Sequence, residues 1–440
     1  MPTNSTASPG SNRGEGGAPS SYRVPFLLKY RSFFSIGEIE GNVILQLAFG
    51  ALLILCFLTF FRGWETSTAI TVESYANNSY VCWPYFQTCG QYYFLHALPY
   101  GYSQTILYAI LLGVMFLTAW AMYAKKWVYA HMGLAALWIW KVLVVFVLSK
   151  LLANNFDYYD IILLFILLML PRKLFFLRLT FVSFYFLGAT LKFDDGWILG
   201  TYFTSLKIGL PIFGNALAPI LTNLVTCVEV VGCWFLLSDR RLLQRLAFCF
   251  FFAFHLYSSI IINYRFPVAA LLMLVILFGI NEENPPVPLD RRSVFGWLLL
   301  AFLFCLQLTP FVMHANPELT GEGNQYRFFM FEANHQCRSE ITVYEKNGSA
   351  QSSETDSINS RDRCDPYNTW FGLKQRCERD PTIARIGWTF DHSLDGGPFY
   401  RIIDVPDACA LTYHAFSQNA WIKTPPLAPV VGYPVKNILF

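Results

Sequence analysis

One short segment places a cation, two carboxylates and an indole close together, as Lys192, Asp194, Asp195 and Trp197. An apolar stretch precedes Lys192, so we expect this lysine at the end of a membrane helix. Burial disfavours the charged form of a lysine, and the neutral amine can act as a base. The same residues also suit an interfacial anchor, with Trp197 among lipid headgroups and Lys192 extending to water. The spacing alone leaves both interpretations open.

Three further ionisable residues, Lys141, Glu229 and His255, lie inside apolar segments. An ionisable side chain within a bilayer costs several kcal/mol and therefore marks either a functional site or a bond between helices. As a structural pair, Lys141 and Glu229 could bridge two helices. As functional residues, the three could line a ligand pocket or relay protons.

Other chemistry finds little support in the sequence. No zinc-protease, nucleophile-elbow or phosphate-loop motif occurs. Asp391, His392 and His414 are scattered, so we expect surface residues there and no metal site. The net charge is only +3, which gives no basic surface for nucleic acid.

The elements that carry these residues are predicted to cross a membrane. Apolar residues make up 55% of the chain and charged residues 14%, whereas soluble domains are nearer a quarter charged. The fourth and fifth of nine apolar segments are separated by Pro171-Arg172-Lys173 and could be short helices or partly re-entrant. The sequence thus predicts an all-α polytopic transmembrane bundle of about nine helices. The segments are 43–61, 104–124, 128–149, 157–170, 174–190, 217–237, 246–264, 266–280 and 294–310.

Basic residues predict the orientation of this bundle. They concentrate in alternate loops, which the positive-inside rule places in the cytoplasm. The N-terminus is then cytoplasmic and, with nine spans, the C-terminus lies outside. No cleavable signal peptide is visible, and we expect the first span to direct insertion. The cytoplasmic set is Lys125, Lys126, Arg172, Lys173, Arg240, Arg241, Arg245, Arg291 and Arg292.

Cysteines and glycosylation sequons agree with this orientation. Six of the eleven cysteines fall in the segments assigned outside, as do the sequons at Asn77 and Asn347. We expect disulfides in an oxidising compartment, such as the endoplasmic reticulum lumen, another secretory lumen or the outer side of a bacterial membrane. Six cysteines allow fifteen pairings, so the connectivity stays open. The six are Cys82, Cys89, Cys337, Cys364, Cys377 and Cys409.

Three regions follow from composition. Residues 1–35 are predicted to be a disordered cytoplasmic tail, and residues 36–310 the transmembrane domain. Residues 311–440 are more polar and rich in turns, and they predict a small luminal, disulfide-bearing β-rich domain. Its expected strands are 339–346, 383–390 and 399–404.

The segment from Tyr185 to Trp197 resembles a stretch of the vitamin K-dependent γ-carboxylase family, within the broader HTTM superfamily of membrane proteins. Four other places agree in order, over roughly residues 40–350. They are Val81-Cys82-Trp83-Pro84, Asn154-Asn155, Phe254-His255-Leu256 with Ser258, and the stretch from Gln307 through Pro310, His314, Gly323 and Phe328 to Tyr344.

The resemblance implies a carbon–carbon lyase with reduced vitamin K or another quinone as cofactor and no metal. Lys192 matches the family's base, which deprotonates the hydroquinone. The oxidised product then removes a γ-proton from a glutamate before CO2 adds. Leu191 and Phe156 replace a neighbouring lysine and a histidine of the family, and most of its long luminal region has no counterpart in this chain.

Two functions therefore stand side by side. One is a quinone-dependent, carboxylase-like enzyme in which His255, Glu229, Lys141, Asp194, Asp195 and Trp197 surround or serve the base Lys192. The other is a non-enzymatic HTTM membrane protein that binds a lipid, peptide or protein partner through its luminal domain. A transporter is less favoured, because no inverted repeat is evident.

Overall fold

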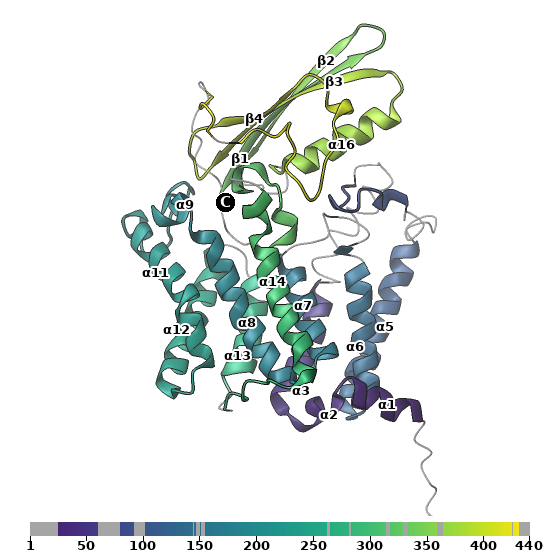
Figure 1. Ribbon diagram of the computed structural model, residues 1–440, viewed down its shortest axis with the longest axis vertical. Helices are drawn as coiled ribbons and strands as arrows, with labels where there is room; N and C mark the ends of the chain where they lie inside the picture. Colours follow the sequence, from purple (N-terminus) through teal and green to yellow (C-terminus); the bar gives the residue numbers. More distant parts are fainter. Residues whose placement is uncertain are drawn as a thin grey trace, which may run out of the picture.

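The fold is mostly helical, with a small antiparallel sheet near the C-terminus (Figure 1). The computed structural model describes residues 25–59, 80–91, 102–143, 145–146, 150, 155–261, 265–280, 283–313, 317–328, 333–358, 364–424 and 426–430. The helices lie side by side along the long axis, and the sheet covers one end of them. We call this end the outer end.

Helices occupy each of the nine apolar segments, because these stretches hold few residues that break a helix. Within the described part of the chain, two helical stretches are long and apolar enough to cross a membrane, Lys173–Lys192 and Arg291–Met313. In the described residues, the helices of these segments are α3 (Val43–Phe57), α5 (Tyr102–Tyr123), α6 (Trp127–Leu143), α7 (Asn155–Met169), α8 (Lys173–Ala189), α11 (Ala218–Val230), α12 (Arg241–Ile261), α13 (Arg265–Phe278) and α14 (Val294–Met313).

A tight turn separates α7 from α8, the pair that the sequence left least certain. Pro171 interrupts the apolar run, and Arg172 adopts a left-handed backbone with φ of 57°. The carboxylate of Glu38 accepts hydrogen bonds from the backbone N–H groups of Arg172 and Lys173, at 3.0 and 2.8 Å. This side chain from a distant segment therefore caps the start of α8. The two segments form two helices of ordinary length.

Short elements turn the chain back over the outer end of α8. A 3₁₀ turn, η6 (Thr190–Lys192), extends α8, and α9 (Asp195–Ile198) and α10 (Thr201–Thr204) follow. The chain then enters α11 through η7 (Asn215–Leu217). The predicted segment 217–237 is split, because α11 ends at Val230 and η8 (Gly232–Leu237) continues as a 3₁₀ helix.

The prediction of a disordered tail over residues 1–35 is wrong at its end. Helices α1 (Pro25–Phe33) and α2 (Ile36–Gly41) form there. The Tyr30 hydroxyl lies 3.0 Å from Nδ1 of His131 in α6, and Phe34 packs on the same ring. Apolar and aromatic residues in this stretch can bury surface against the bundle. The sequence before it is more polar and offers few such residues. Residues 1–24 lie outside the described part.

The C-terminal sheet has four antiparallel strands in the order β2-β1-β3-β4. The three expected strands correspond to β1 (His335–Glu345), β3 (Ile383–Leu394) and β4 (Tyr400–Val405). Strand β2 (Ala350–Ile358) and helix α16 (Pro366–Arg379) were not predicted. Side chains of α16 and β3, including Trp370 and Trp388, form the core of this domain. Shorter helical turns are η9 (Arg291–Ser293), α15 (Pro317–Thr320), η10 (Asn324–Tyr326) and η11 (Ala408–Ala410).

All six predicted cysteines form disulfides, as Cys82–Cys89, Cys337–Cys364 and Cys377–Cys409. The first of these closes a loop that belongs to the C-terminal domain, although the sequence assigned it to residues 36–310. The Tyr367 hydroxyl of α16 donates to the carbonyl of Cys82 at 2.8 Å. Apolar side chains of residues 81–89 complete the domain core. The boundary after residue 310 is also too early, because α14 continues to Met313.

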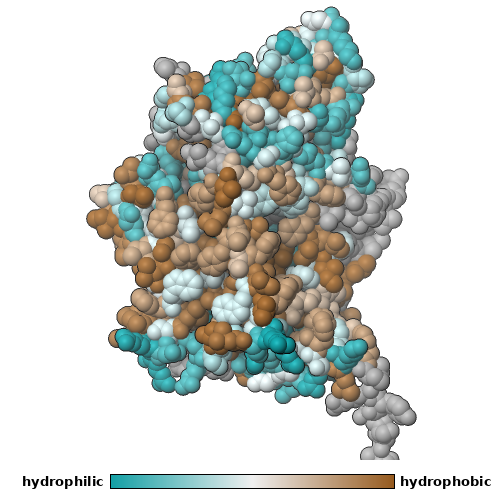
Figure 2. Space-filling view, in the orientation of Figure 1, coloured by the Kyte–Doolittle hydropathy of each residue, from teal (hydrophilic) through white to brown (hydrophobic). Residues whose placement is uncertain are grey.

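The surface of the helical part carries a band of apolar side chains between two polar ends (Figure 2). Large apolar side chains on several helices are strongly exposed, such as Phe116, Ile220, Phe302 and Val312. An exposed apolar surface on this scale marks a contact with membrane or protein.

Candidate functional site

A cavity of about 310 Å³ lies among α8, α11 and α12 near the outer end. Its walls are mostly aromatic and aliphatic, with Phe181, Phe184 and Phe254 among them. Four of the predicted site residues line it: Lys192, Trp197, Glu229 and His255. The structure therefore brings together side chains from four separate elements.

Lys192 and Glu229 form a buried ion pair at this cavity. The Lys192 ammonium contacts Oε2 of Glu229, and each residue is only 2% exposed. The ammonium also lies 4.6 Å from the centre of the Trp197 ring, a cation–π contact. Of the two interpretations left open for Lys192, the interfacial anchor does not fit, because the side chain is buried within the protein. The expected partner of Glu229, Lys141, lies elsewhere.

Local capping explains how Trp197 reaches the lysine. Asp194 precedes α9, and its Oδ1 accepts a hydrogen bond of 3.0 Å from the backbone N–H of Trp197. This N-cap starts a new helical turn immediately after η6. The chain is thereby folded back, and the indole ring covers the Lys192 ammonium.

A second polar point in the cavity is the pair His255 and Tyr185. The Tyr185 hydroxyl and Nε2 of His255 are 2.6 Å apart, and His255 is 2% exposed. The Tyr185 ring packs on Phe251 at a centroid distance of 4.1 Å. Tyr185 belongs to the segment that suggested the site, but its pairing with α12 was not predicted.

Gln307 holds the end of α8 in place. This side chain of α14 is 2% exposed and donates to the carbonyl of Leu187 at 3.0 Å and to the Thr190 hydroxyl at 3.2 Å. Its own carbonyl oxygen accepts from the backbone N–H of Phe328 at 3.0 Å. No role was predicted for the Gln307 side chain. In the structure it fixes the turn that presents Lys192.

The cavity reaches the surface of the helical part between α11 and α12. Leu224 and Ala253 line it and are also exposed, as is Phe213 in the loop before α11. Leu224 lies within α11 and Ala253 within α12, and the strongly exposed large side chains of these helices include Ile220, Leu242 and Leu246. A lipophilic molecule could enter through this opening from the side.

Asp194 and Asp195 do not line the cavity. They border a separate polar recess of about 850 Å³ between the outer end of the helices and the sheet domain. Glu318 and Asp395 line the same recess. The structure therefore separates these two carboxylates from Lys192, Glu229 and His255.

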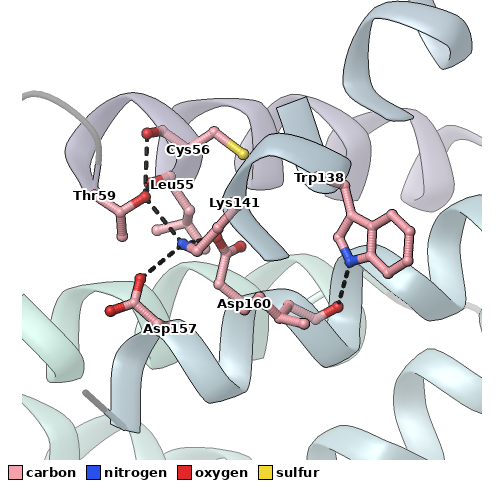
Figure 3. A network of polar contacts seen from close by, with 8 residues as sticks. Leu55, Cys56, Thr59, Trp138, Lys141, Asp157 and Asp160 are labelled. Carbon is pink, nitrogen blue, oxygen red and sulfur yellow. Dashed lines mark hydrogen bonds and ion pairs between the residues drawn. The ribbon is translucent and has the colours of Figure 1, made fainter. Parts of the chain in front are cut away.

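Lys141 lies in another buried network, shown in Figure 3. Its ammonium contacts Oδ1 of Asp157 at 3.1 Å and Oδ2 of Asp160 at 2.5 Å, and it donates to the Thr59 hydroxyl at 3.0 Å. The expected pair of Lys141 with Glu229 is wrong, because the carboxylates of α7 lie closer. Their spacing, Asp-x-x-Asp at the start of an apolar helix, is the sequence signal that indicates this network.

The remaining predicted positions lie in the C-terminal domain or outside the description. Asn347 is exposed at the turn between β1 and β2. Asn77 lies outside the described residues. His392 is buried, contrary to the expected surface position. A hydrogen bond of 3.1 Å between its Nε2 and Nδ1 of His335 satisfies one of its ring nitrogens there. Burial, together with the neighbouring His335, lowers the pKa of His392 to about 3.

No family model, curated protein or solved structure matches this chain. The geometry of the site itself therefore carries the functional argument.

Proposed function

We propose that this chain is a multi-pass membrane protein of the HTTM type that binds a reduced quinone in the cavity and removes a proton from it. Three features support the membrane location. The apolar band has the form expected of a lipid-facing surface (Figure 2). The turns that carry Lys125, Arg172 and Arg291 lie at the end away from the sheet (Figure 1). The disulfides lie at the opposite, outer end.

The cavity fits a small aromatic ligand. Its volume of about 310 Å³ is at the lower limit of typical ligand sites, and its lining is apolar with a few polar groups. The opening between α11 and α12 is lined by exposed apolar side chains, Leu224 and Ala253, which suits a ligand that partitions into lipid. A quinone with an apolar tail would place its ring inside and its tail through this opening.

The single observation that carries the proposal is the Lys192–Glu229 pair at the wall of an apolar cavity. Burying an ion pair costs free energy that packed apolar residues would avoid, so a pair beside a ligand site indicates function. When bound, a reduced quinone supplies two phenolic protons and two electrons. Lys192 and Glu229 together can accept one of these protons, while Trp197 keeps water from the ammonium. Tyr185 and His255 offer a second point for hydrogen bonding.

Binding of a reduced naphthoquinone to the purified protein tests this proposal, with quenching of tryptophan fluorescence as the signal. We expect saturable binding to the native chain. Lys192→Ala should weaken it about tenfold or more, since it removes a charge-assisted hydrogen bond. Ala253→Trp should also weaken it by filling the opening.

Lys207→Ala is the matched control, because Lys207 is an exposed lysine of the same outer end that does not line the cavity. It should bind like the native chain. Equal binding by all four proteins would contradict the proposal. Saturable binding of a fatty acid in the absence of quinol binding would support the lipid-binding alternative instead.

A further inference from the structure

A second cavity, of about 500 Å³, lies where α7 and α14 meet the C-terminal domain. The described residues that line it include none that line the cavity at Lys192. The two cavities are neighbours on α7, because Tyr158 lines the second and Tyr159 lines the first. A volume of this size is typical of a site for a small molecule.

The half of this second cavity that the helices form is apolar. Its lining side chains are Ile161 and Ile162 of α7 and Phe302, Leu303 and Leu306 of α14. Phe302 is 57% exposed, so this wall reaches the surface of the helical part. The apolar half therefore suits the body of a lipid molecule.

The other half of the cavity carries an ion pair, Lys150 with Asp365. The Lys150 ammonium contacts Oδ2 of Asp365, and the two side chains are 16% and 18% exposed. Both partners are held from outside the pair. The backbone N–H of Lys150 donates to the carbonyl of Val81 at 2.9 Å, and Oδ1 of Asp365 accepts from the backbone N–H of Tyr367 at 3.0 Å. The pair is therefore in position before a ligand binds.

This pair offers a donor and an acceptor to the same ligand group. The Lys150 ammonium also donates to Oδ1 of Asn368 at 3.1 Å, so its contacts with described residues use two of its three N–H donors. Oδ2 of Asp365 can accept a further hydrogen bond. A hydroxyl group can accept from the ammonium and donate to the carboxylate while the pair stays intact. A charged head group, in contrast, is repelled by one member of the pair.

A further part of the lining is aromatic and fixed. Trp83, Tyr85 and Tyr326 contribute to it. The rings of Trp83 and Tyr85 stack with centroids 5.5 Å apart and planes inclined by 15°, and the Trp83 indole N–H donates to the carbonyl of Val145 at 2.6 Å. Such rings give a large contact area at little cost in conformational entropy. A rigid ligand also loses less entropy on binding than a flexible chain does.

We propose that the second cavity binds a lipid with a rigid, fused-ring body and a single hydroxyl head group, which is the chemistry of a sterol. The hydroxyl group lies at Lys150 and Asp365, and the ring body lies between α7 and α14. The inference does not depend on the ligand of the Lys192 cavity.

Retention of tritiated cholesterol by the purified full chain in detergent tests this site. We expect saturable binding to the native chain. Three unlabelled competitors test the ligand chemistry: cholest-5-ene, which lacks the hydroxyl group, cholesterol sulfate, which has a negative head group, and oleyl alcohol, which has a flexible chain. Each should need about tenfold or more of the concentration at which unlabelled cholesterol displaces the label, because each loses hydrogen bonds or rigidity.

Matched variants locate the site. Leu306→Trp fills the apolar half and should remove most of the binding. Leu308→Trp is the control, because Leu308 is 58% exposed on the same helix and does not line the cavity. Asp365→Asn keeps the side-chain oxygen that caps α16 but removes the charge, and it should weaken binding about tenfold. If this variant fails to fold, the competitors still test the hydroxyl group on the native chain.

Several results would overturn the proposal. One is the absence of saturable binding to the native chain, and another is displacement by cholest-5-ene as effective as that by cholesterol. Equal binding by Leu306→Trp and Leu308→Trp would place the sterol elsewhere on the surface. Ala253→Trp, which fills the opening of the first cavity, should bind cholesterol like the native chain. Loss of binding in that variant would place the sterol at Lys192 and leave the test with reduced naphthoquinone unaffected.

Discussion

The buried pair of Lys192 and Glu229 joins the end of α8 to α11, and each partner makes burial of the other tolerable. Removal of one partner leaves an uncompensated charge in an apolar wall. We therefore expect Lys192→Met to destabilise the protein by about 3–5 kcal/mol.

The double variant Lys192→Met/Glu229→Met should recover most of that loss, since no charge then remains. Thermal melting in detergent would compare the single and double variants with Lys207→Met as the control. A double variant less stable than Lys192→Met would show that the two side chains do not interact as a pair.

His392 predicts how the C-terminal domain responds to acid. The pKa of the folded domain's His392 is about 3, against about 6.5 in an unfolded chain. Below about pH 6.5 the unfolded chain binds a proton that the folded domain does not. The free energy of unfolding should therefore fall by up to about 1.4 kcal/mol for each pH unit below that value.

The variant His392→Gln should flatten this acid response, as followed by tryptophan fluorescence during unfolding at a series of pH values. His414→Gln is the control, because His414 is exposed. If His392→Gln lost stability in acid as the native chain does, the acid response would come from another group.

The site residues were foreseen more readily than their partners. Lys192, Glu229 and His255 stand out because an ionisable residue in an apolar run is unusual. The partner of each residue depends on which helices are neighbours and which faces they turn toward one another. The periodicity within one segment does not predict this arrangement. Lys141 thus received the wrong partner, and Gln307 received no role although it holds the turn beside Lys192.

Between elements, close packing of α8 and α14 depends on one glycine. A Cβ atom at Gly296 would lie 2.3 Å from the ring of Phe176, so Gly296→Ala should destabilise the protein by about 1–3 kcal/mol.

The same change at Gly113 of α5 meets nothing within 4 Å and should stabilise the helix by about 0.5–1 kcal/mol. Melting temperatures of the two variants should move in opposite directions. A loss of stability in both would mean that helix packing at Gly296 is not the cause.

Helices could be predicted in the apolar segments because these stretches hold few residues that break a helix, although the split of 217–237 after Val230 was not predicted. Strand β2 was missed because its sequence, Ala350–Ile358, is polar and shows no apolar alternation. It forms as an edge strand, whose backbone pairs with β1. Helix α16 was missed because it is polar overall, and the start signal in its sequence, Asp365 followed by Pro366, was overlooked.

Over the whole molecule, the two polar ends differ in chemistry. The end away from the sheet carries basic turns, and the outer end carries the disulfides and the Asn347 sequon. If the outer end faces a secretory lumen, Asn347 should be glycosylated, since its turn is exposed.

A shift in gel mobility after endoglycosidase treatment would detect the glycan, and Asn347→Gln should abolish the part of the shift due to this site. Cys305→Ser, which changes a residue of α14 and no sequon, serves as the control. In sealed secretory vesicles, we also expect the outer domain to be fully protected from an added protease. Digestion of this domain would show that the orientation is opposite to the predicted one.

The loop closed by Cys82 and Cys89 has a consequence for synthesis. The Tyr367 hydroxyl, which donates to the carbonyl of Cys82 in the outer domain, lies 285 residues further along the chain. At translation rates of about 5–20 residues per second, the loop must wait roughly 15–60 s for that residue to be made. Its short disulfide can form during the wait, but its apolar side chains have nothing of that domain to pack against. If the outer end faces a secretory lumen, chaperones that shield apolar surfaces would therefore bind this loop early, before the later helices of the chain are synthesised.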